Sequence, residues 1–99
     1  MSLSGKQARY LRGLGHHLKA VVMVGKEEIN PAVIAATEEA LLSHELIKVK
    51  IQEGCPSDRK LVAAQLAKAT GAAVAQVLGR TILLYRQNPD NRQIELPRN

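Results

Sequence analysis

Aromatic residues are scarce in this sequence, which has no Phe, no Trp and only two Tyr, Tyr10 and Tyr85. Proteins that read single-stranded nucleic acid on a β-sheet or barrel stack successive bases on several aromatic side chains. The composition therefore argues against an RNA-recognition motif, a cold-shock domain and a typical oligonucleotide-binding barrel.

Cysteine and long apolar runs are also scarce. Cys55 is the only cysteine, so it cannot form an internal disulfide, which suits a reducing compartment. No apolar run reaches membrane length, and residues 1–6 lack the charged-then-apolar plan of a secretory signal. We therefore expect a cytoplasmic protein that does not enter a membrane.

No group of residues has the pattern of a reaction centre. His16 and His17 are adjacent and His44 is isolated, so the histidines lack the spacing of a zinc site. The acidic pairs 27–28 and 38–39 consist of adjacent residues, whose side chains point apart on a helix or strand. We expect no catalytic residue, metal site, cofactor or small-molecule substrate, and hence no enzyme.

The 99 residues, 45% of them hydrophobic, are enough for one α/β domain with a two-layer core. Periodicity and turn signals predict a four-stranded mixed sheet covered by helices, in the order α-β-α-β-α-β-β. The expected elements are a helix over 4–14, a strand over 20–24, a helix over 31–43, a strand over 46–51, a helix from Ser57 to Gly71, and strands over 73–78 and 81–86.

Several details of these elements are predicted as well. The strand over 20–24 is apolar on both faces, so we expect it to be central. Asn30 and Ser57 are the expected helix caps, and Gly79-Arg80 suits a type II′ hairpin turn. The first helix should gather Leu3, Tyr10, Leu11, Leu14 and Leu18 on one side, and the third should bury Leu61, Val62, Leu66 and Ala69. Residues 88–99 form a polar, basic tail, in which a short strand can occupy 93–96.

The net charge of +5 is unevenly distributed. Residues 1–26 hold five cations and no acid, residues 27–54 hold six acids and two lysines, and residues 55–99 hold seven cations and three acids. If the two ends meet in space, they form one positive face that suits a polyanion. The alternative is ordinary charge that keeps a small domain soluble.

Three features could form such a face. Lys6, Arg9 and Arg12 share one side of the first helix and could follow a phosphate backbone, or they could be a solvated helix face. The turns Gly25-Lys26-Glu27-Glu28 and Gly79-Arg80 place glycine beside a cation, which lets a phosphate approach the backbone. The first of these could instead be a plain turn. Glu27 and Glu28 could instead serve the dipole of the following helix.

Several dispersed motifs, in order, resemble the stand-alone bacterial YhbY proteins, each a single CRM domain. The matching stretches are Leu11-Arg12-Gly13-Leu14-Gly15-His16 with Leu18-Lys19, Val21-Val22-Met23-Val24-Gly25-Lys26, His44-Glu45-Leu46-Ile47-Lys48-Val49-Lys50 and Gly79-Arg80-Thr81-Ile82-Leu83-Leu84-Tyr85-Arg86. The resemblance covers nearly the whole chain, so we expect residues 1–99 to form a single CRM domain. It implies an RNA-binding α/β fold similar to the C-terminal domain of translation initiation factor three, and a role in assembling the large ribosomal subunit.

The resemblance also implies an RNA-contacting GxxG loop at residues 25–28. Glu28 stands where that pattern has glycine, and Ala20 stands where proline is expected after the lysine. With the basic features above, the expected RNA-binding residues are Lys6, Arg9, Arg12, His16, Lys19, Gly25, Lys26, Glu27, Gly79, Arg80 and Arg86. The expected partner is ribosomal RNA in precursors of the large subunit, bound by a monomer. The alternative function is a protein-interaction module that docks an acidic partner on the basic face.

Overall fold

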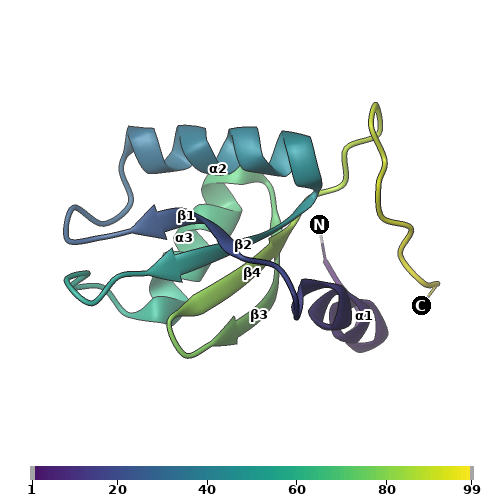
Figure 1. Cartoon of the computed structure of the whole chain (residues 1–99), viewed down its shortest axis with the longest axis horizontal. Helices are drawn as coiled ribbons and strands as arrows, with labels where there is room; N and C mark the ends of the chain where they lie inside the picture. The colour runs from purple at the N-terminus through teal and green to yellow at the C-terminus, as the bar shows by residue number, and fades with distance from the viewer. Residues whose placement is uncertain (1, 99) are drawn as a thin grey trace.

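A computed structural model describes residues 2–98, and its elements follow the predicted order (Figure 1). The helices are α1 (Gly5–Gly15), α2 (Pro31–His44) and α3 (Arg59–Thr70), and the strands are β1 (Ala20–Val24), β2 (Leu46–Ile51), β3 (Ala73–Leu78) and β4 (Thr81–Tyr85). The predicted fold class, with three helices packed on a four-stranded mixed sheet, is therefore confirmed. None of the helices within the described range is both long and apolar enough to cross a membrane.

The sheet has the strand order β1-β2-β4-β3. Strand β1 runs parallel to β2, whereas β4 runs antiparallel to both β2 and β3. The expectation that residues 20–24 form a central strand is wrong, because β1 lies at the edge. Only Val22 and Val24 are buried in the core, whereas Val21 and Met23 are 54% and 48% exposed. Apolar side chains on both faces of a strand do not ensure that a helix or another sheet covers both faces.

The helices lie on both faces of the sheet. Helices α2 and α3 cover one face, where Leu41, Val62 and Leu66 pack against Val49 and Ile82. Helix α1 covers only part of the other face, where Leu11 packs with Leu46, Ala75, Leu83 and Tyr85. The rest of this second face remains open and carries the site described below.

The predicted helix ends are correct at two places and displaced at a third. The Asn30 side chain accepts a hydrogen bond from the Val33 N–H ahead of Pro31, and Gly71 ends α3 in a left-handed conformation. The N-cap of α3 is Asp58 rather than Ser57, because the Asp58 carboxylate accepts from the Lys60 N–H. The Ser57 hydroxyl instead donates to the Glu28 carboxylate.

Two predicted apolar stripes are only partly buried. On α3 the buried stripe is Val62, Ala63, Leu66 and Thr70, so the prediction was wrong for Leu61, which is 50% exposed, and for Ala69. Of the residues predicted to gather on one side of the first helix, Leu11 is buried, but Tyr10, Leu14 and Leu18 are exposed, and Leu18 lies beyond the end of α1. Neighbouring stripes satisfy the same helical period, and tertiary packing decides which one is covered.

The tail contains no strand at 93–96, which corrects that expectation, yet it packs against the domain. Ile94 and Leu96 contact the cluster of Leu11 and Tyr85. The Glu45 carboxylate accepts hydrogen bonds from the backbone N–H groups of Asn88, Gln93 and Ile94. A buried anion thus replaces the missing strand partners for these N–H groups.

Candidate nucleic-acid interface

A groove of about 520 Å³ runs between α1 and the open face of the sheet. We call it the basic groove. Its cationic or imidazole side chains come from α1, from the connection that follows and from the middle of β2, and they are Arg9, Arg12, His16, His17 and Lys48. Gln76, Leu78 and Thr81 line it from β3 and β4, and none of the described residues that line it is Asp or Glu.

The close approach of α1 to the sheet depends on Gly15. A Cβ atom on Gly15 would lie 2.8 Å from Cδ1 of the buried Leu83. Because Gly15 has no side chain, the end of α1 rests directly on β4. This contact brings Arg12 and His16 to the same hollow as Lys48.

The second basic residue of β2 continues this surface toward the hairpin turn. Lys50 follows Lys48 by two residues, so both side chains are on the open face. Lys50 lines a smaller hollow of about 340 Å³ with Arg80, Met23 and Glu53. Lys48 and Lys50 therefore connect the groove that holds Arg9 and Arg12 to the hollow that holds Arg80.

Backbone conformation at the two predicted glycine turns is unusual. Gly79 has φ +58°, a positive value that an II′ turn requires at its first central residue. Glu28 has φ +58° as well, so it adopts the left-handed conformation for which the family pattern uses glycine. Its N–H donates to the Gly25 carbonyl at 2.9 Å and closes the turn. Lys26 and Glu27 are exposed on this turn.

Arg86 lies apart from this surface. Its guanidinium donates to the Glu38 carboxylate at 2.8 Å and to the Thr70 carbonyl at 2.7 Å, so it ties α2 to the end of α3. Lys6 is exposed on the first turn of α1, and Lys19 lies on the other side of the α1–β1 connection from the basic groove. The roles predicted for these residues remain predictions.

The sequence reasoning missed the contribution of β2. The alternation in residues 46–51 predicted that Lys48 and Lys50 share one face, but these lysines were not assigned to the site. Two lysines on the open face of a strand were the signal that could have identified them. His17 was missed because only its neighbour was expected to contact RNA.

Two ionisable groups with displaced pKa values lie outside the basic groove. Burial alone raises the pKa of Glu45, but the three backbone N–H donors and Arg92 outweigh burial and hold the pKa below its ordinary 4.5. Burial and the Glu45 charge raise the pKa of Tyr85 above 10.0, against the effect of Arg92. Both groups belong to the packing of the tail.

Within the described residues, no three His, Cys, Asp or Glu side chains group as a metal site would require.

Comparison with known proteins gives several full-length relatives. The chain is 43% identical over 95 residues to "Probable RNA-binding protein YqeI" of Bacillus subtilis, with 96% of this chain and 99% of that protein covered. It is 40% identical over 97 residues to the "RNA-binding protein" of Haemophilus influenzae, with 98% and 97% covered.

A solved structure agrees with these matches. The solution structure of the hypothetical protein SAV1595 from Staphylococcus aureus superposes with a TM-score of 0.83 at 40% identity, covering 97% of this chain and all of that one. The model of the CRS1 / YhbY (CRM) domain matches residues 3–86. This chain therefore belongs to the CRS1 / YhbY (CRM) domain family.

Proposed function

We propose that this chain is a non-enzymatic RNA-binding protein of the cytoplasm that contacts ribosomal RNA in precursors of the large ribosomal subunit and assists their assembly. The observation that carries the proposal is the convergence of Arg9, Arg12 and Lys48 on one groove whose lining has no acid. Cations held along a groove neutralise successive phosphates and release their counterions. The names of the relatives as RNA-binding proteins support the same function.

The form of RNA follows from the chemistry of the groove. The groove has no aromatic platform other than the two imidazoles, so its main contacts are to phosphate and sugar rather than to a row of stacked bases. Such contacts recognise the shape of a folded or paired RNA. Lys6 can extend the phosphate path along α1, and the turns with Lys26 and Arg80 can extend it along the open face. Arg86 is left out of the proposed surface because it is already paired with Glu38.

The test is the salt dependence of binding to a folded fragment of large-subunit ribosomal RNA, with an unrelated duplex and a single strand as competitors. We expect steep loss of affinity with salt for the native chain. Arg12→Glu should weaken binding and reduce the slope of log K against log salt by about 1, and adding Arg9→Glu should reduce it by about 1 more.

The matched control is Lys68→Glu, which makes the same charge change at an exposed position of α3, on the helix-covered face. It should change the affinity far less than Arg12→Glu does. If both reversals have the same small effect, the basic groove is only a solvated surface. The chain would then fit the alternative function, a module that docks an acidic protein.

A further inference from the structure

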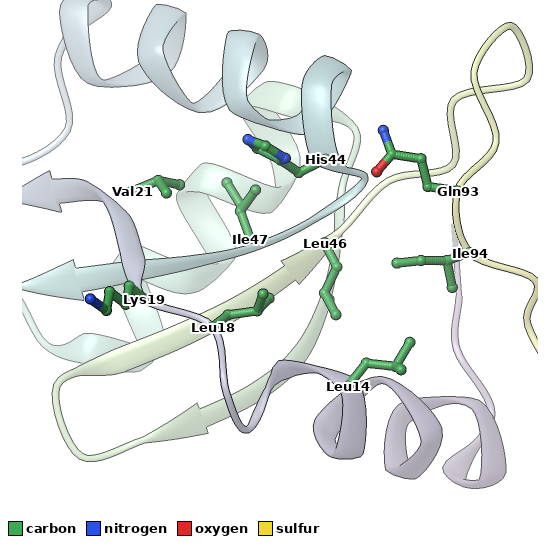
Figure 2. Close-up of a pocket in the computed structure, with 9 residues that line it drawn as sticks. All are labelled: Leu14, Leu18, Lys19, Val21, His44, Leu46, Ile47, Gln93 and Ile94. Atoms are coloured by element: carbon green, nitrogen blue, oxygen red, sulfur yellow. The ribbon is translucent and has the colours of Figure 1, made fainter.

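A second hollow, of about 430 Å³, opens on the other side of the α1–β1 connection. We call it the apolar notch, and Figure 2 shows the side chains that surround it. Six of them are aliphatic and come from α1, the connection, two strands and the tail: Leu14, Leu18, Val21, Leu46, Ile47 and Ile94. Leu14, Leu18 and Val21 are 42%, 38% and 54% exposed, so much of this apolar surface faces water.

The notch exists because β1 starts late. The first residue of β1 pairs with Lys48, so among the described residues 2–98 no strand neighbours Leu46 and Ile47 on that side. The end of α1 bounds the gap below, the end of α2 bounds it above, and the tail bounds it at Ile94 (Figure 2). Its volume of about 430 Å³ is within the range of pockets that hold small ligand groups.

The notch and the basic groove are parts of one surface. Leu46 and Lys48 lie on the same face of β2, about 7 Å apart. Residues 16–19 contribute to both hollows, since His16 and His17 line the basic groove whereas Leu18 and Lys19 line the notch. This separation is within the reach of one nucleotide, from its phosphate to its base.

The charge around the notch also favours a nucleotide. Lys19 lines it, and no Asp or Glu does so within the part of the chain that the structure describes. The nearby Glu45 carboxylate is buried and accepts three backbone hydrogen bonds from the tail, so its charge is compensated locally. His44 and Gln93 bring the polar groups to the rim.

We propose that the apolar notch binds one unpaired base of an RNA whose backbone lies in the basic groove. The inference rests on the proposed function and adds a subsite to it. The aliphatic side chains of the notch make dispersion contacts with the faces of the base and exclude water. Lys19 binds a flanking phosphate, and the polar groups at the rim form hydrogen bonds with the edge of the base. The preferred RNA is therefore a duplex interrupted by an extruded nucleotide.

The experiment compares two RNA hairpins with the same stem, one fully paired and one with a single bulged 2-aminopurine. The native chain should bind the bulged hairpin about tenfold more tightly, equivalent to about 1.4 kcal/mol. On binding, the 2-aminopurine fluorescence should change, and the methyl NMR signals of Leu14, Leu18 and Ile94 should shift. The paired hairpin should not shift these methyl signals.

Leu18→Ser and Val21→Ser should each bring the two affinities close together without loss of folding, because both side chains are partly exposed. Leu61→Ser is the matched control, since Leu61 is 50% exposed on α3 and does not line the notch. It should keep the tenfold preference. A thermal melt of each variant checks that it is folded.

The outcomes separate this inference from the function on which it rests. Equal affinity of the native chain for both hairpins, or a preference that both serine variants retain, overturns the base site. In either case, a loss of binding in Arg12→Glu still supports the RNA-binding function. If the native chain binds neither hairpin nor the ribosomal fragment, the proposed function fails and the base site fails with it. Methyl shifts with an acidic protein and none with RNA would assign the notch to a protein partner and overturn the inference.

Discussion

The carboxylate of Glu45 accepts a hydrogen bond from the backbone N–H of Gln93 at 2.6 Å, although the two residues are 48 positions apart. The same oxygen accepts from the Ile94 N–H at 2.8 Å, and the other oxygen accepts from the Asn88 N–H at 2.7 Å. Glu45 is fully buried and forms the C-cap of α2 with φ +60°. One buried side chain thus fastens the tail to the end of a helix.

Glu45→Gln should lower the free energy of unfolding by about 2 kcal/mol at pH 7, because the amide NH₂ group faces an N–H donor and the charge is lost. Since the pKa of Glu45 is lower in the folded state than its ordinary 4.5, the native carboxylate stabilises the fold above that pH. This stabilisation is lost as pH falls through the folded-state pKa. Denaturant unfolding from pH 7 to pH 3 should therefore give a flatter profile for the variant.

The control for this experiment is Glu95→Gln, which makes the same change at an exposed position of the tail. It should leave both the stability and the pH profile close to those of the native chain. Parallel profiles for the native chain and Glu45→Gln would show that the Glu45 charge does not hold the tail.

Gly15 and Gly13 form a matched pair of helical glycines. Gly13→Ala meets no atom within 4 Å and should stabilise the protein by up to about 1 kcal/mol through helix propensity. Gly15→Ala places a Cβ against buried Leu83 and should instead destabilise it by about 1–3 kcal/mol. Leu83→Val shortens the side chain that the new Cβ contacts, so the double variant should recover part of the lost stability. Equal stabilisation by both alanines in thermal or urea unfolding would contradict the close contact.

The turn that carries Glu28 should repel RNA more than a turn with glycine there would. Glu28→Gln removes one negative charge and should tighten RNA binding about two- to fivefold at low salt, an effect of up to about 1 kcal/mol. Glu28→Gly should tighten it further, since it also removes the side chain and the cost of positive φ. Glu39→Gln, at an exposed position of α2, is the control and should have little effect. No gain from either Glu28 variant would place this turn outside the RNA surface.

Substitutions of Arg86 and Arg80 should affect different properties, the stability of the fold in the first case and RNA affinity in the second. Arg86→Gln should lower the free energy of unfolding by about 1 kcal/mol, since it breaks contacts to Glu38 and Thr70, and should leave RNA affinity unchanged. Arg80→Gln should do the reverse, because Arg80 is exposed beside Lys50. Fluorescence-monitored unfolding and RNA titration measure the two effects. A large loss of affinity in Arg86→Gln would restore it to the binding surface.

Local patterns predicted much of the fold. The alternation in residues 46–51, the cap at Asn30 and the glycine at the end of α3 each depend on nearby residues, and the structure agrees with all three. The incorrect predictions concern the tertiary contacts of an element, that is, which distant part of the chain packs against it. The edge position of β1, the exposure of Leu61 and the docking of the tail on Glu45 depend on residues far away in the chain.

The order of the elements and the excess of cations at both ends follow from the sequence alone, because periodicity and capping depend on nearby residues and charge is a sum over the chain. The family resemblance follows from the motifs as they stand in the sequence. Tertiary packing, in contrast, brings Arg12 and Lys48 to one groove, pairs Arg86 with Glu38, and leaves an apolar notch next to the groove. These relationships are set by which side of the sheet each helix covers. That choice depends on the packing of Gly15 against Leu83 and of α2 and α3 against the opposite face.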